Sequence, residues 1–254
     1  MTKRLKDFMT NTNTSDSLSN EPQSQHNSQH SQQQQPEYTT TNNNNQNRNF
    51  CVSLDRCESS SISQYVPVVV ELCTRLIELH VNDEGIYRKV GQKQVVTALK
   101  QQLNRGILNI DVSDYNWDNP HAVVSLLKCF LNELPDSLST SQYYHELIQM
   151  SKIDNHHTRL LNIKKLLHKF SAYNFETLKY LSAHLRRVAA AYQHNKMTIK
   201  NLCIAFSQSI IRHNDASCET IKADHLNQSL IIEIMLVYVS SPFFFLLCYE
   251  MLMI

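Results

Sequence analysis

The sequence predicts an all-α protein. Through most of residues 49–240, apolar side chains recur at three- and four-residue spacings, which is the period of an amphipathic helix. No segment alternates apolar and polar residues as a half-buried strand would, and no unit of about 20–50 residues repeats. Prolines stand where helices are expected to begin or end. Together these observations favour one helical domain.

The first three helices have recognisable ends. One is expected over about 67–80, with a proline suited to its first turn. A second lies between Gly91 and Gly106, with the later glycine as a stop signal. A third begins at Asn119, which can cap the helix, and Pro120 suits its first turn.

Five further helices are predicted from the same periodicity. The longest places Leu178, Leu181, Leu185 and Val188 on one face. The remaining four are shorter, and the five together are expected at about 140–151, 156–170, 174–192, 198–212 and 224–239.

The two ends of the chain differ in composition from this helical region. Residues 1–48 consist largely of Gln, Asn, Ser and Thr, and cannot bury enough apolar surface to offset their conformational entropy, so we expect them to be disordered. Residues 241–254 form an apolar tail that includes Phe243–Phe245. A membrane span needs about 20 apolar residues. The tail is shorter and contains Glu250, so membrane anchoring is possible but disfavoured.

Overall composition excludes several classes of function. The formal net charge is +1, which gives no strong field for binding nucleic acid. The seven cysteines contain no C-x-x-C pair, and His156 and His157 are adjacent, so we predict no metal site. An odd number of cysteines without a signal peptide favours reduced thiols and a cytoplasmic location.

One loop is unusual in its use of glycine. All three glycines lie between residues 85 and 106, and Gly85 and Gly91 bracket Arg88. Glycine is used where the backbone must turn sharply or approach another surface closely. Loops held by rigid helices often carry function, so this loop is the first candidate for a site.

The loop Glu84–Gly91 resembles the catalytic loop of the RhoGAP domain, which has the form Gly-aliphatic-aromatic-Arg-x-x-Gly. Three further blocks are similar to that family and occur in its order: Ser125–Pro135, Tyr173–Val188 and Asn195–Phe206. The opening residues Tyr65–Val70 look most like the large members that also carry PDZ and PH domains.

The resemblance implies a RhoGAP-like helical bundle over 49–240 and an activator of Rho-family GTPases. GTP hydrolysis moves negative charge onto the γ-phosphate and bridging oxygens, and a guanidinium supplied in trans stabilises that charge. Arg88 would be this arginine finger. For GTPases of the Ras type the effect is about 10³–10⁵-fold, or roughly 4–7 kcal/mol of the barrier. GTP and Mg²⁺ belong to the partner, so the chain is expected to need no cofactor and to perform no chemistry of its own.

By the same resemblance, Lys128, Asn132 and Asn201 belong to the GTPase interface, while Gly85 and Gly91 set the geometry of the finger loop. The sequence departs from the family pattern at two places. Asn132 stands where an arginine usually steadies the finger loop, and Ser207-Gln208 replaces a Gly-Pro pair. Because asparagine is shorter and uncharged, the loop is expected to be less preorganised.

These departures and the apolar C-terminal tail leave two alternatives to activation. The domain would then bind GTP-loaded Rho-family proteins without stimulating hydrolysis, or act as a helical scaffold held at a membrane by its C-terminal tail. The identity of the GTPase is not encoded in any single motif, because specificity is spread over several helices.

Overall fold

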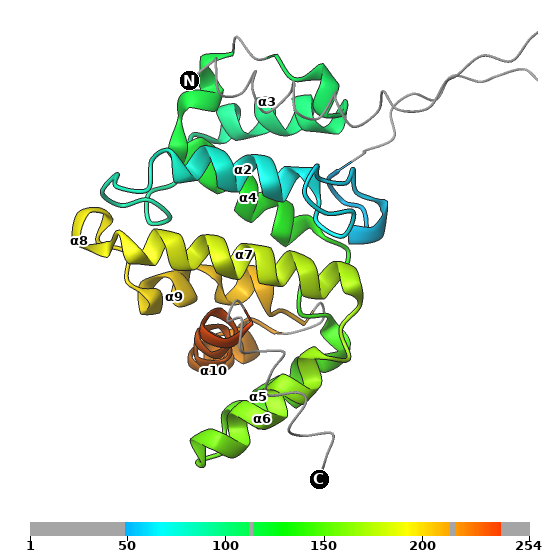
Figure 1. Cartoon of the computed structure of the whole chain (residues 1–254), viewed down its shortest axis with the longest axis vertical. Helices are drawn as coiled ribbons and strands as arrows, with labels where there is room; N and C mark the ends of the chain where they lie inside the picture. The colour runs from blue at the N-terminus through cyan, green and yellow to red at the C-terminus, as the bar shows by residue number, and fades with distance from the viewer. Residues whose placement is uncertain (1–48, 112–113, 214–216, 240–254) are drawn as a thin grey trace, which may run out of the picture.

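The computed structural model describes residues 49–111, 114–213 and 217–239, and within them it confirms the all-helical prediction (Figure 1). The described chain contains no β-strand, only one isolated bridge between Ser59 and Pro67. Its α-helices are α2 (Val68–Glu78), α3 (Lys93–Asn104), α4 (Pro120–Glu133), α5 (Tyr144–Ser151), α6 (His156–Leu167), α7 (Ala172–Ala190), α8 (Tyr192–Asn195), α9 (Ile199–Ile210) and α10 (Cys218–Tyr238). Short 3-10 helices lie at Leu54–Arg56 (η1), Ile107–Asn109 (η2), Tyr115–Asp118 (η3) and Ser141–Tyr143 (η4).

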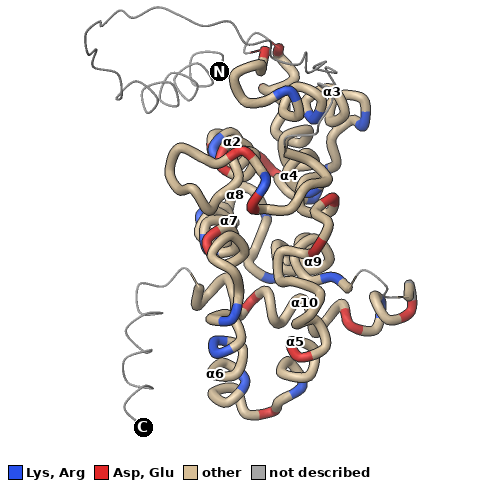
Figure 2. Tube along the Cα trace, turned by 90° about the vertical axis from the view of Figure 1, so that its right-hand side faces the viewer, with Lys and Arg blue, Asp and Glu red and all other residues tan. Residues whose placement is uncertain are grey.

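The expected polar segment 1–48 and apolar tail 241–254 lie outside the described residues. Within the described ranges, no helix combines the length and apolar character that crossing a bilayer requires. Lys and Arg are interspersed with Asp and Glu along much of the described trace (Figure 2).

The helices pack around α4. Helix α4 contacts α2, α3 and α9, while α7 contacts α2, α9 and α10 (Figure 1). Helices α5 and α6 pair at the end of the molecule away from α3, and α10 joins this pair to α9. This arrangement leaves the α2–α3 loop beside α8.

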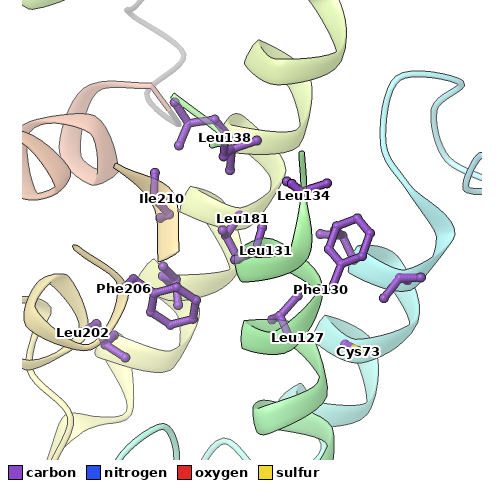
Figure 3. Close-up of a cluster of buried hydrophobic side chains, with 14 of the residues drawn as sticks. Cys73, Leu127, Phe130, Leu131, Leu134, Leu138, Leu181, Leu202, Phe206 and Ile210 are labelled. Carbon is purple, nitrogen blue, oxygen red and sulfur yellow. The ribbon is translucent and has the colours of Figure 1, made fainter. Parts of the chain in front are cut away.

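The core forms where four helices present apolar faces to one another (Figure 3). Leu127, Phe130 and Leu131 of α4 point into it and are essentially inaccessible to solvent. Each such side chain contributes about 1.5–3 kcal/mol by its removal from water. Side chains from the other three helices complete the cluster: Cys73 of α2, Leu181 of α7, and Leu202, Phe206 and Ile210 of α9.

Helix α4 is held at both ends by side chains. At its start, the Asn119 carboxamide oxygen accepts hydrogen bonds from the backbone N–H groups of His121 and Ala122, as the sequence predicts. At its end, the Arg212 guanidinium donates to the carbonyls of Leu131 and Leu134. These carbonyls would otherwise lack a partner within the helix.

Several helix ends differ from the predicted ones. The final helix begins at Cys218 rather than near 224, since the Ser217 hydroxyl caps it. The helix expected at 140–151 begins with the 3-10 turn η4. The helix expected at 174–192 ends at Ala190, and α8 follows before Lys196 adopts a left-handed conformation.

Substituting Phe130→Ala should lower the free energy of unfolding by about 3–5 kcal/mol. Phe130 is 1% exposed and meets the Phe50 ring edge-on, with centroids 5.7 Å apart, so truncation leaves a cavity that rigid helices fill poorly. Urea denaturation followed by circular dichroism measures the change. Tyr115→Ala is the matched control, because that ring is 79% exposed and its loss should change stability by about 0.5 kcal/mol or less.

Candidate functional site

The loop Glu84–Gly91 folds as tight turns at the end of α2. Gly85 has φ +81°, a conformation that side chains with a Cβ atom rarely adopt. Its carbonyl accepts hydrogen bonds from the N–H groups of both Arg88 and Lys89 at 2.9 Å, and its own N–H donates to the Asn195 carbonyl at 3.1 Å. The first predicted loop glycine is therefore placed at a turn that favours glycine.

Gly91, the second glycine expected to set the loop geometry, lies directly against helix α4. A Cβ atom there would stand 2.5 Å from the Cα of Ala122 and 2.7 Å from the carbonyl oxygen of His121, closer than real atoms approach. The Gly91 N–H donates to the Ser125 hydroxyl at 2.9 Å. Gly91 thus lets the far end of the loop contact the backbone of α4.

Between the two glycines, Tyr87 has its side chain buried and its backbone in the left-handed region. Its φ is +65° and its exposure is 2%. A bulky residue in this conformation is strained by about 1–3 kcal/mol and persists only where the surroundings hold it. Two contacts do so: Lys128 Nζ donates to the Tyr87 carbonyl at 3.1 Å, and the Tyr87 hydroxyl lies 2.6 Å from His184 Nε2.

Arg88, the next residue, projects from the surface. Its side chain is 61% exposed, and its Nη2 lies 3.7 Å from Oε1 of Glu84, which is itself 65% exposed. An ion pair between two such exposed groups contributes about 0–1 kcal/mol. The guanidinium is therefore available to exchange Glu84 for a stronger anionic partner.

Lys128 is half-buried under the loop. Its Nζ lies 5.9 Å from the centre of the Tyr87 ring and 5.3 Å from that of Phe206. Burial lowers the pKa of the Lys128 ammonium from its ordinary value. The aromatic faces and the Tyr87 carbonyl favour the charged form, so the lysine acts here as a fixed cation within the protein.

Asn201 and Asn132 occupy different positions relative to this loop. Asn201 is exposed in the first turn of α9, and its Nδ2 donates to the Lys196 carbonyl at 3.2 Å. Asn132 is exposed one turn beyond Lys128, and its side chain makes no hydrogen bond to residues 84–91. The loop contact that the family pattern assigns to position 132 is thus absent here.

A cleft of about 670 Å³ lies beside Lys128, and none of the loop residues 84–91 lines it. Asn132 and Lys128 of α4 line one side, and Ile204 and Gln208 of α9 line the other. Arg212 also lines the cleft, as do Ile221, His225 and Gln228 of α10. The predicted interface residues on α4 therefore line a cleft, and one of them, Lys128, also bonds to the Tyr87 carbonyl of the loop.

Asn195 is one of the loop contacts that the sequence does not predict, as are His184 and Ser125. The Asn195 side chain is fully buried, donates to the carbonyls of Val81 and Val188 at 2.7 and 2.8 Å, and accepts from the Met197 N–H at 2.7 Å. Its backbone carbonyl holds Gly85. Asn195 is the first residue of the Asn195–Phe206 block, which is the only sequence signal that points to it.

The described residues contain no group of three or more His, Cys, Asp or Glu side chains placed to bind a metal ion. Cys203, on α9 near the cleft, is a buried free thiol. Burial raises the pKa of this thiol to about 12, which leaves it protonated and unreactive as a nucleophile at neutral pH.

Gly91→Ala is expected to lower the free energy of unfolding by about 1–3 kcal/mol, because the added methyl group overlaps backbone atoms of α4 that have no flexible side chain to yield. Thermal denaturation measures the loss. The neighbouring Gln92→Ala is the control, since Gln92 is exposed and makes no capping hydrogen bond. Equal stability of the two variants would contradict the proposed close contact.

The sequence of this chain matches a known domain family. The RhoGAP domain model matches residues 67–215. Rho GTPase-activating protein 21 of Mus musculus is 35% identical over 167 residues, covering 65% of this chain and 9% of that protein. GTPase-activating protein pac-1 of Caenorhabditis elegans is 36% identical over 194 residues, covering 74% and 12%. This chain therefore matches only about a tenth of the length of these relatives.

Solved structures agree with the sequence comparison. The crystal structure of human Rho GTPase activating protein 15 superposes with a TM-score of 0.69 at 25% identity, covering 80% of this chain and 97% of that one. The BH domain from GRAF, the GTPase regulator associated with focal adhesion kinase, gives a TM-score of 0.59 at 26% identity, covering 67% and 90%. Sequence and fold lead to one conclusion: this chain belongs to the RhoGAP domain family.

Proposed function

We propose that this domain accelerates GTP hydrolysis by a Rho-family GTPase and that Arg88 is the arginine finger. The observation that carries the proposal is an exposed guanidinium on a loop fixed by buried contacts, within a RhoGAP domain. In this role the domain is a GTPase activator and not itself an enzyme, because the bond is broken in the partner's active site.

The chemistry requires little from the activator beyond a positioned positive charge. In the transition state, negative charge spreads over the phosphate oxygens, and a planar guanidinium can donate two hydrogen bonds to them at once. GTP, Mg²⁺ and the group that orients water belong to the GTPase. Arg88 gains these strong acceptors in exchange for one weak contact with Glu84.

The GTPase is proposed to dock on the surface formed by the end of α4 and by α9. Lys128 and Asn132 line the cleft there, and Asn201 lies exposed at the start of α9. A partner that covers both this cleft and the Arg88 loop would exclude water around the guanidinium. Exclusion of water strengthens the interaction of the guanidinium with phosphate. Such a partner implies a cytoplasmic setting.

A second candidate is a module that binds the GTPase without stimulating hydrolysis. The lack of a hydrogen bond between the Asn132 side chain and loop residues 84–91 favours it, since only Lys128 of α4 bonds to Tyr87 there. Against it, the Lys128 ammonium bonds to the loop backbone at Tyr87, the Asn195 carbonyl holds Gly85, and Gly91 contacts α4. These three contacts restrict the loop independently of residue 132. The membrane-scaffold alternative depends on the tail 241–254, which lies outside the described residues.

Arg88→Ala should reduce the saturating rate of stimulated GTP hydrolysis about 10³-fold or more, while affinity for the GTP-loaded partner changes about tenfold or less. Phosphate release from a panel of Rho-family GTPases, under single-turnover conditions with activator in excess, measures the rate. Lys165→Ala is the control, because this exposed cation lies on α6, away from the loop.

Three outcomes of this assay separate the candidates. Stimulation by the native chain that Arg88→Ala abolishes supports the finger. Equal stimulation by both proteins contradicts the assignment of Arg88. Binding to a GTPase without any stimulation by the native chain favours the binding module.

Lys128→Met should lower the saturating rate about 10–100-fold and also weaken binding. Methionine keeps much of the apolar stem but removes the donor to the Tyr87 carbonyl and the charge beside the cleft. Titrating the activator in the phosphate-release assay separates the two effects. Lys100→Met provides the matched control, since Lys100 pairs with Glu133 on the other side of α4. An unchanged rate for Lys128→Met would show that the loop does not need this bond.

A further inference from the structure

We propose that His184 is a positioning residue for the arginine finger, acting through the hydroxyl of Tyr87, and that Glu78 fixes the tautomer in which His184 accepts that hydroxyl. The inference deepens the proposed function and rests on it. Neither residue touches the surface on which a GTPase would dock. His184 is fully buried on α7, and Glu78 is the last residue of α2.

The three side chains form a continuous chain of hydrogen bonds. The Tyr87 hydroxyl lies 2.6 Å from His184 Nε2, and His184 Nδ1 lies 2.7 Å from Oε1 of Glu78. Arg187, one turn further along α7, donates to the same Glu78 oxygen from its Nε and Nη2 at 2.8 and 2.7 Å. The chain therefore runs from the loop through α7 to the end of α2.

The direction of each hydrogen bond follows from the charges. Although burial alone would raise it, the hydrogen bonds from His184 and Arg187 hold the pKa of the Glu78 carboxyl below its ordinary value. Burial lowers the pKa of His184, so its ring is neutral at neutral pH. An ionised Glu78 only accepts, so Nδ1 carries the imidazole proton. Nε2 is then the acceptor, and the Tyr87 hydroxyl must donate to it.

The hydrogen bond from the Tyr87 hydroxyl to His184 restrains Tyr87, the residue that directly precedes Arg88. Tyr87 has a left-handed backbone, and its ring is fixed edge-on against Phe206, with centroids 5.0 Å apart. The Lys128 bond holds its carbonyl, while the His184 bond holds the far end of its ring. Two restraints at opposite ends of one residue fix its orientation, where one alone would leave a hinge. Because Arg88 is joined directly to Tyr87, fixing Tyr87 also fixes the position of the Arg88 backbone.

Two substitutions of His184 separate its hydrogen bond to Tyr87 from its hydrogen bond to Glu78. In His184→Gln, the side-chain carbonyl reaches the place of Nε2 and accepts from Tyr87, but the contact with Glu78 is lost. In His184→Asn, the amide nitrogen takes the place of Nδ1 and donates to Glu78, but Tyr87 loses its acceptor. A merely structural histidine would make no such distinction, whereas a positioning role requires the glutamine variant to retain more activity.

Tyr87→Phe and His184→Asn should each lower the saturating rate of stimulated hydrolysis about three- to tenfold, with half-saturating concentrations within about twofold of the native value. The double variant Tyr87→Phe/His184→Asn should be no slower than the slower single variant, because the two changes remove the same hydrogen bond. His184→Gln should stay within about twofold of the native rate. The control is Tyr180→Phe, which removes a hydroxyl from α7, the helix that carries His184. The Tyr180 hydroxyl lies 3.5 Å from Thr74 Oγ1, and its loss should leave the saturating rate unchanged.

Several results would overturn the inference. A native rate for Tyr87→Phe, losses that multiply in the double variant, or losses confined to the half-saturating concentration would each do so. Equal activities of the asparagine and glutamine variants would also contradict it.

A second measurement judges the hydrogen bond independently of GTPase stimulation. Amide hydrogen exchange should be faster at residues 85–88 in Tyr87→Phe than in the native chain, and unchanged in α2 and α7. Unchanged loop exchange would overturn the inference. If the native chain stimulates no GTPase, the proposed function fails, and faster loop exchange would still show that the hydroxyl restrains the loop.

Discussion

The site depends on the burial of one aromatic side chain, that of Tyr87. With φ at +65° its backbone turns the chain sharply, so that the ring enters the core while the next side chain, Arg88, leaves it. Burying a tyrosine ring stabilises the fold by about 1.5–3 kcal/mol, which offsets the strain of the left-handed backbone. The exposure of the guanidinium is thus a consequence of how its neighbour packs.

Packing around Tyr87 draws on helices far apart in the sequence. Lys128 of α4 and His184 of α7 bond to its two ends, and Phe206 of α9 packs against its ring. Because α4 lies at the centre of the bundle, contacts to it place the loop relative to the whole domain. The glycines serve the same end: Gly85 permits the first turn, and Gly91 brings the loop onto α4.

The helices and the loop could be predicted from sequence because their signals are local. Apolar spacing, the Asn119 cap and the clustering of glycine each extend over a few residues. The contacts that hold the loop are not local: Tyr87 and His184 are 97 residues apart, and Asn195 and Val81 are 114 apart. A buried histidine on an apolar helix face has the same pattern whether it packs passively or bonds to a distant loop. Only the structure distinguishes the two.

The effect of asparagine at position 132 depends on what else holds the Arg88 loop. The expected loss of a loop contact at this position agrees with an asparagine side chain that does not reach the loop. How preorganised the loop is depends on how many restraints remain, so the lower preorganisation expected from Asn132 stays a prediction. The Lys128 ammonium, the His184 ring and the Asn195 carbonyl each restrain it from a different helix or turn. The Gly91 N–H adds a fourth restraint through the Ser125 hydroxyl of α4. None of the four involves residue 132, so the loop is held at several points without an arginine there.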